Sequence, residues 1–266
     1  MLNREQTWDT FFGEVNKHCD NRDNGDRSLH RFLVYALAPG TGKTTMLVTS
    51  GEEFERRRAA GTLSPNFPSQ RLDIFTTFNF TTAAEASDRE HPQFALAWRM
   101  FDAVFATSTY DGSCDAPLRE ALRSVLDHEA LLRHALLAIR QHRVNIGKCG
   151  VDERLAINLC IDEFPKMLAE GLAQAQRQAP LYAMIKALGK LLCAPPEKLL
   201  LIVTMAGTTA VDLDQSMLII FIFFLLLFGI YGLLTICTPL QFFAVRHSRS
   251  ARSRCLFSLP SKLCPM

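Results

Sequence analysis

The chain has 266 residues, of which 48% are hydrophobic and 21% charged, so it is long and apolar enough to form a globular core. The formal net charge of +2 does not indicate a nucleic-acid-binding protein. The 8 cysteines form no CxxC pair and no cluster with histidine at ligand spacing, which argues against a zinc site or a disulfide framework and is typical of a reducing compartment.

Residues 1–30 form a polar N-terminal segment that begins without the apolar stretch of a secretory signal. We therefore expect a cytoplasmic or nuclear location for the folded part of the chain. The aromatic residues of this segment, Trp8, Phe11 and Phe12, favour a short amphipathic helix.

A continuous apolar run over 32–38 predicts a strand that is buried on both faces, and a helix is expected to follow over 44–58. The turn between them reads Pro-Gly-Thr-Gly-Lys-Thr. A triphosphate needs a backbone that curls around phosphate oxygens with its N–H groups pointing inward, and glycines permit that path. A lysine that reaches the phosphates and a hydroxyl that ligates Mg²⁺ complete such a site.

This turn therefore predicts a binding site for a nucleoside triphosphate, ATP or GTP, with Mg²⁺. The residues expected to hold the nucleotide are Pro39, Gly40, Thr41, Gly42, Lys43, Thr44 and Thr45. Thr44 is also expected to ligate the metal. The full pattern, GxxxxGK followed by Ser or Thr, has a glycine at the position where this chain has Leu37. The alternative interpretation is an accidental glycine-rich turn.

The β-branched and aromatic residues over 72–80 predict a second strand. Two amphipathic helices are expected next, and we interpret their apolar stripes as core packing. The first stripe consists of Phe94, Trp98, Phe101 and Phe105, and the second of Leu118, Leu122, Val125, Leu132, Leu136 and Ile139.

Another apolar run over 155–161 predicts a third strand. A helical region over 166–193, broken near Pro180, separates it from a fourth strand over 199–204. Strands that alternate with helices indicate βαβ units. The fold class expected is therefore α/β: a three-layer sandwich around a mostly parallel sheet of at least four strands.

Polar residues mark the ends of the last two strands: Asp162 and Glu163 follow the third, and Thr204 ends the fourth. Because ligands gather at the carboxyl ends of parallel strands, we expect Asp162 to complete the Mg²⁺ shell and Glu163 to polarise an attacking water as general base. Thr204 is expected to approach the γ-phosphate or that water. The alternatives are a helix cap for the acidic pair and a structural hydroxyl for Thr204. Arg99 and Arg140 are candidate arginine fingers that no pattern distinguishes from solvated helix charges.

On these residues the chain resembles the additional-strand P-loop ATPases, the group that contains AAA+ and STAND proteins. The resemblance places Walker A at 38–45, Walker B at 157–163 and a sensor-1 strand at 199–204. It covers roughly 30–210 and implies ATP hydrolysis coupled to a conformational change, with Lys43 on the phosphates, Asp162 on Mg²⁺ and Glu163 on water. Residues 76–80 and 96–99 bear a weaker likeness to Crinkler-type or retrotransposon-hot-spot P-loop domains.

Two features depart from a compact AAA+ core. The stretch from Lys43 to Asp162 is long, so extra helices are expected after the second strand. No fifth strand, second sensor or helical lid is evident after Thr204. These departures leave open a scaffold, or degenerate remnant, that binds nucleotide without turnover. A small-molecule kinase is a third alternative.

The composition changes near residue 217, after an NTPase domain expected over 31–214. Residues 217–240 carry no charge and predict a hydrophobic helix of about 36 Å, which exceeds the roughly 30 Å of a bilayer core. A basic tail over 241–266 follows. The alternatives for this segment are a membrane anchor, a replacement of the ATPase C-terminus by a truncated or shifted reading frame, and a buried strand or helix.

The function expected is nucleotide binding and hydrolysis coupled to conformational change, with the NTPase domain in the cytoplasm or nucleus and 217–240 as a candidate membrane anchor. A protein partner and a homo-oligomer are both compatible with that function, and the sequence identifies neither.

Overall fold

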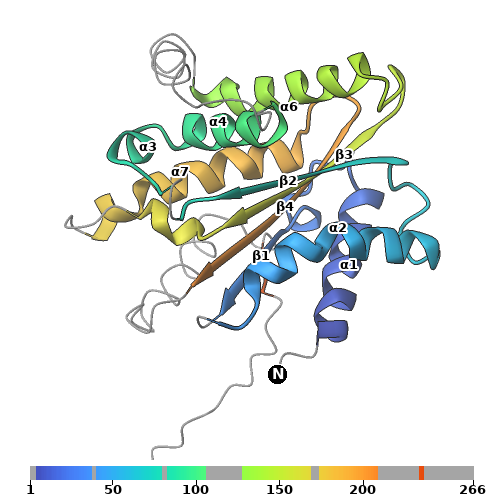
Figure 1. Ribbon diagram of the computed structural model, residues 1–266, viewed down its shortest axis with the longest axis horizontal. Helices are drawn as coiled ribbons and strands as arrows, with labels where there is room; N and C mark the ends of the chain where they lie inside the picture. Colours follow the sequence, from blue (N-terminus) through green and yellow to red (C-terminus); the bar gives the residue numbers. More distant parts are fainter. Residues whose placement is uncertain are drawn as a thin grey trace, which may run out of the picture.

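The computed structural model describes residues 4–37, 40–79, 83–105, 128–168, 174–208 and 234–236, and these form a mixed α/β fold with helices on both faces of a parallel sheet (Figure 1). The strands are β1 (Phe32–Leu37), β2 (Gln70–Thr77), β3 (Leu155–Asp162), β4 (Leu199–Thr208) and β5 (Leu234–Ile236). The helices are α1 (Arg4–Asp20), α2 (Lys43–Ala59), α3 (Ala86–Glu90), α4 (Pro92–Phe105), α6 (His128–Asn145) and α7 (Gln174–Cys193), with short 3-10 turns at Arg27–Leu29 and Phe164–Met167.

The sheet has the strand order β2-β3-β4-β1-β5, and every described pairing in it is parallel. Strand β3 lies inside the sheet and is buried along its whole length. Its alternate residues point to opposite faces, so Leu159 and Ile161 contribute to one core while Ala156 and Cys160 contribute to the other. The expected three-layer sandwich with at least four mostly parallel strands is confirmed.

Helices α4, α6 and α7 cover one face of the sheet, and α1 and α2 cover the other (Figure 1). The second face depends on the N-terminal segment. Trp8, Phe11 and Phe12 of α1 are buried, and the rings of Phe11 and Phe12 meet the ring of Phe54 on α2 at centroid distances of 5.9 and 4.8 Å. The aromatic residues of the polar N-terminal segment therefore form the centre of a core.

Extra helices follow β2, as expected from the long stretch between Lys43 and Asp162: α3, α4 and α6 all precede β3. The apolar stripe of α4 is only partly core. Phe94 is buried, but Trp98 and Phe101 are partly buried and Phe105 is 39% exposed. The helix instead turns Ala97 and Met100 inward with Phe94. In the second stripe Leu132, Leu136 and Ile139 are buried on α6, and the rest of that stripe lies outside the described residues.

Two expected element ends are wrong. Helix α7 continues through Pro180 instead of breaking there. Proline removes one backbone donor from a helix interior, and the remaining turns of α7 are held by Met184, Leu188 and Leu192 in the core. Strand β4 continues beyond Thr204 to Thr208, because Met205 and Ala206 extend its apolar run.

The segment expected as one hydrophobic helix over 217–240 contains strand β5 at Leu234–Ile236, which pairs in parallel with β1 from Phe32 to Val34. The prediction of a continuous helix over that segment is therefore wrong at these three residues. They form the fifth strand, which was not evident from the sequence. The remainder of the segment, and the basic tail, lie outside the described residues. Within the part of the chain that the structure describes, no helix is both long and apolar enough to cross a bilayer.

Candidate functional site

The loop between β1 and α2 has the backbone that a phosphate-binding turn requires. Gly40 has φ +75° and Gly42 has φ +84°, both in the left-handed region that glycine adopts at little cost. Gly42 is the N-cap residue of α2, so the backbone N–H groups of the first turn of that helix lie directly after it. Pro39 lies outside the described residues.

The side chains on either side of Gly42 differ in burial. Lys43 is only 6% exposed at the first position of α2, whereas Thr41, Thr44 and Thr45 are exposed. Lys43 thus directly follows the left-handed Gly42, at the start of α2.

The loop and the acidic pair meet, although 118 residues separate them in the sequence. The Thr44 hydroxyl donates a hydrogen bond of 2.8 Å to Oδ2 of Asp162. Oδ1 of the same carboxylate accepts a bond of 3.0 Å from the backbone N–H of Glu163. Asp162 is 5% exposed and is the last residue of β3, so its carboxylate is held at the carboxyl edge of the sheet. The structure thus brings together Thr44 and Asp162, the two residues expected to ligate Mg²⁺.

Glu163 directly follows Asp162 and has a strained backbone. Its φ is +52°, and it caps the 3-10 turn Phe164–Met167. A non-glycine residue in the left-handed region costs roughly 1–3 kcal/mol, and such strain is concentrated at functional sites. The Glu163 side chain is half-buried, and it is the backbone N–H of this residue that donates to the Asp162 carboxylate.

Thr204 does not end its strand. It is in register with Leu33 of β1 and Cys160 of β3, and Ala206 is the residue beside Asp162. Thr204 therefore lies two residues, or about 7 Å along the strand, before the edge where Asp162 lies. Its hydroxyl is buried without a hydrogen-bond partner in the described structure. The hydroxyl-bearing residue at the end of β4 is Thr208, in register with Leu37, which the uninterrupted apolar run after Thr204 could have indicated.

The two candidate arginine fingers have structural partners. Arg99 forms an ion pair of 2.9 Å with the fully buried Asp88 and lies 4.5 Å from the ring centroid of Phe78. Arg140 donates to the backbone carbonyls of Val151 and Glu153. Both guanidinium groups therefore contact residues of the segment between β2 and β3, which contains the extra helices.

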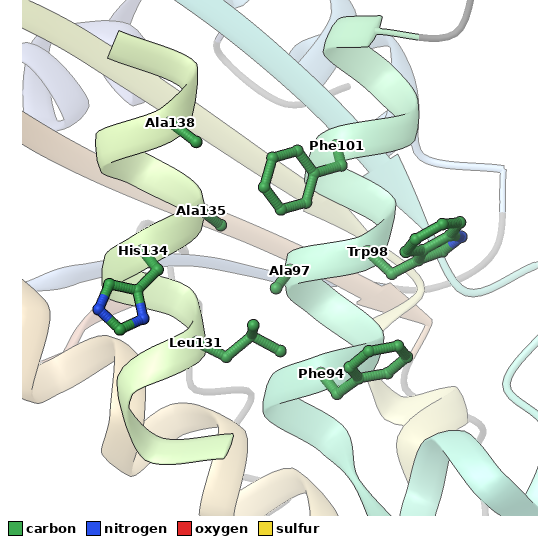
Figure 2. A pocket seen from close by; sticks show the side chains of 8 residues that line it. All are labelled: Phe94, Ala97, Trp98, Phe101, Leu131, His134, Ala135 and Ala138. Atoms are coloured by element: carbon green, nitrogen blue, oxygen red, sulfur yellow. The ribbon is translucent and has the colours of Figure 1, made fainter. Parts of the chain in front are cut away.

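A pocket lies between α4 and α6. This pocket has a volume of about 210 Å³, and its walls are almost wholly apolar. Figure 2 shows that its lining side chains come from these two helices: Phe94, Ala97, Trp98, Phe101, Leu131, His134, Ala135 and Ala138. Three members of the predicted α4 stripe thus line this pocket. It lacks the charged donors that a polyphosphate requires.

The residues at the loop fit a nucleotide that carries Mg²⁺. No group of three or more His, Cys, Asp or Glu side chains in the described ranges is placed to cage a metal on its own. Magnesium, however, is usually bound through one or two protein oxygens together with substrate phosphates. The Thr44 hydroxyl and the Asp162 carboxylate are oxygen donors of that kind, and the left-handed glycines allow close approach of a phosphate chain.

Comparison with known proteins does not assign a family. No family model matches the chain, and no curated protein matches it. One similar solved structure is a chain in the structure of Drosophila ORC bound to DNA, with a TM-score of 0.40 and 16% identity over 82% of this chain and 40% of that one. The chain thus spans less than half the length of that neighbour, and a similarity of this size supports no conclusion about function.

Proposed function

We propose that this chain is a P-loop NTPase that binds a nucleoside triphosphate with Mg²⁺ at the loop after β1 and hydrolyses it. The observation that carries the proposal is the 2.8 Å hydrogen bond between the Thr44 hydroxyl and the Asp162 carboxylate. It joins the first turn of α2 to the end of β3. A hydroxyl and a carboxylate at this junction are the protein ligands that a magnesium–nucleotide complex needs.

The strand order supports the same proposal. Strand β4 lies between β1, which leads into the loop, and β3, which ends in the acidic pair. The additional-strand P-loop group is named for an extra strand in this position. Helix α2 starts beside β1 and packs on β3 and β4, which explains how Thr44 reaches Asp162 across the intervening strand.

Each residue of the site has a distinct role in this proposal. The backbone N–H groups after Gly40 and Gly42 bind phosphate oxygens, and Lys43 adds a positive charge at the same place. Thr44 and Asp162 hold Mg²⁺, which when bound neutralises charge on the phosphates. Glu163 accepts the proton of the attacking water, and it directly follows Asp162 at the carboxyl end of β3.

Nucleotide binding is tested on the full chain with fluorescent ATP and GTP analogues in the presence of Mg²⁺. The Lys43→Ala variant is expected to bind at least about tenfold more weakly, because a charge-assisted hydrogen bond contributes about 1.5–3 kcal/mol. Lys148→Ala, which removes an exposed lysine from the turn after α6, is the matched control. Equal affinity of the Lys43→Ala variant and the unaltered protein would refute the site.

Hydrolysis is tested by phosphate release under the same conditions. Glu163→Gln is expected to lower kcat by about a hundredfold or more while binding is retained, because a general base contributes roughly 10²–10⁴-fold. Glu90→Gln, at the end of α3, is the control. An unaltered protein that binds nucleotide but releases no phosphate would instead identify a non-hydrolysing scaffold.

A further inference from the structure

The first residue of α1 lies beside the loop, although the sequence placed it in a separate polar segment. Nη2 of Arg4 is 3.5 Å from the position that a Cβ atom would occupy at Gly42. Gly42 directly precedes Lys43 and is the N-cap of α2. The Arg4 guanidinium therefore lies next to Gly42, at the place where a side chain of residue 42 would project.

The position of Arg4 is fixed by the packing of α1 on α2. Glu5 pairs with Arg56 and Arg57 at 2.8 and 3.1 Å, and Asp9 pairs with Arg57 at 2.7 Å. Each of these exposed pairs is weak alone. Together with the buried aromatic contacts between α1 and Phe54, they fix both the orientation of α1 about its axis and its position along α2. Arg4 is one residue from Glu5, so it is held at the loop by the same contacts.

Arg4 differs from the neighbouring charged residues of α1 because it has no partner of opposite charge in the described structure. Glu5 and Asp9 pair with arginines of α2, whereas Arg4 is exposed and forms no ion pair or hydrogen bond with any side chain in the described structure. A cation at this place is unfavourable, because Arg4 is the first residue of α1 and lies beside Gly42, the N-cap of α2. Both helix dipoles repel positive charge there, so an anion is the ligand that would relieve the repulsion.

We propose that Arg4 binds the phosphate chain of the nucleotide held at the loop, as a basic residue supplied by α1 of the same chain. This inference rests on the proposed function, and extends the site from the loop and β3 to the N-terminal helix. A guanidinium suits this role because its planar donors match phosphate oxygens and its charge does not depend on pH. Nucleotide binding would then also strengthen the docking of α1 on α2.

The test compares the affinities of the full chain and its variants for ATP, ADP and AMP with Mg²⁺. Arg4→Ala is expected to weaken ATP binding by about tenfold or more, with a smaller loss for ADP and the smallest for AMP. Arg4→Lys is expected to recover part of the affinity, since it keeps the charge but loses the bidentate geometry. Arg27→Ala, which removes an exposed arginine beyond the other end of α1, is the control.

Because Arg4 is exposed, its replacement leaves the core intact, and equal thermal unfolding temperatures without nucleotide would verify this. Unchanged ATP affinity in Arg4→Ala would overturn the inference while leaving the loop site in place. An equal loss for ATP and AMP would also overturn it, since the contact would then involve neither the β- nor the γ-phosphate. If the unaltered chain binds none of the three nucleotides, the proposed function fails and this inference fails with it.

Discussion

Histidines 18 and 30 form a buried pair where the end of α1 meets β4, and their geometry predicts how stability changes with pH. Nε2 of His18 lies 2.9 Å from the carbonyl oxygen of Leu201, and the two Nδ1 atoms are 2.7 Å apart. A carbonyl only accepts, so Nε2 of His18 carries the proton. Nε2 of His30 likewise lies against a carbonyl, that of Asn24, so both neutral rings carry their proton on Nε2 and their two Nδ1 atoms face each other.

Charging His18 is costly in the folded state. Its pKa is lowered from 6.5 to about 4, chiefly because burial disfavours the charged ring, with further contributions from His30 and from the Arg22 guanidinium. The bond to Leu201 opposes this shift, and Asp26 is the acidic group near His30. Between pH 6.5 and 4 the unfolded chain therefore binds more protons at this site than the folded one. The contribution of the neutral His18 to the unfolding free energy is therefore fully present above pH 6.5 and is lost as the pH falls towards 4.

The size of the effect follows from the difference between the two pKa values. At about 1.4 kcal/mol for each pKa unit, a fall from 6.5 to about 4 corresponds to about 3 kcal/mol of unfolding free energy. Urea unfolding, followed by tryptophan fluorescence, measures this free energy between pH 7 and pH 4. His18→Gln keeps a donor for the Leu201 carbonyl but removes the titration.

The unaltered chain should lose about 3 kcal/mol more than His18→Gln over this pH range, whereas carboxylates titrate alike in both proteins. His134→Gln, which replaces an exposed histidine on α6, should retain the pH dependence of the unaltered chain. Parallel stability curves for the unaltered chain and His18→Gln would refute the reasoning.

Two further predictions concern the second core and the loop. Phe54→Ala should lower the unfolding free energy by about 4 kcal/mol, because the ring is fully buried against Phe11 and Phe12; a loss below 1 kcal/mol in urea unfolding would show that α1 is not docked there. Gly42→Ala and Gly61→Ala both force alanine to positive φ and should each cost about 1–2 kcal/mol. Only Gly42→Ala should weaken nucleotide binding more than tenfold, and an equal effect of both variants on affinity would contradict the placement of the ligand.

The sheet and the meeting of the loop with Asp162 could be predicted from sequence because both follow from local patterns. The strands preceding these two places are mostly apolar, with Asn158 as the polar exception in the second, as expected for strands covered on both faces. The carboxyl ends of parallel strands share one edge, so residues that follow two such strands are placed together however long the chain between them. The Thr44–Asp162 contact is an instance of this rule.

Features that depend on distant partners could not be predicted in the same way. The aromatic residues of α1 pack on Phe54, but nothing local distinguishes that partner from any other apolar helix. Strand β5 occupies three residues of an uncharged run whose length alone favours a membrane helix, and only pairing with β1 identifies it as a strand. Thr204 was expected at a strand end because it is polar, yet its hydroxyl is buried inside β4.

The most direct test of the central claim measures the Mg²⁺-dependence of ATP affinity in the unaltered chain, in Thr44→Ala, in Asp162→Asn and in the double variant. If Thr44 and Asp162 hold one metal ion, Mg²⁺ should strengthen binding to the unaltered chain by about tenfold or more, and either single substitution should remove most of that gain. The double variant should lose little more than either single variant. An affinity that does not respond to Mg²⁺, or losses that simply add in the double variant, would contradict a shared metal site.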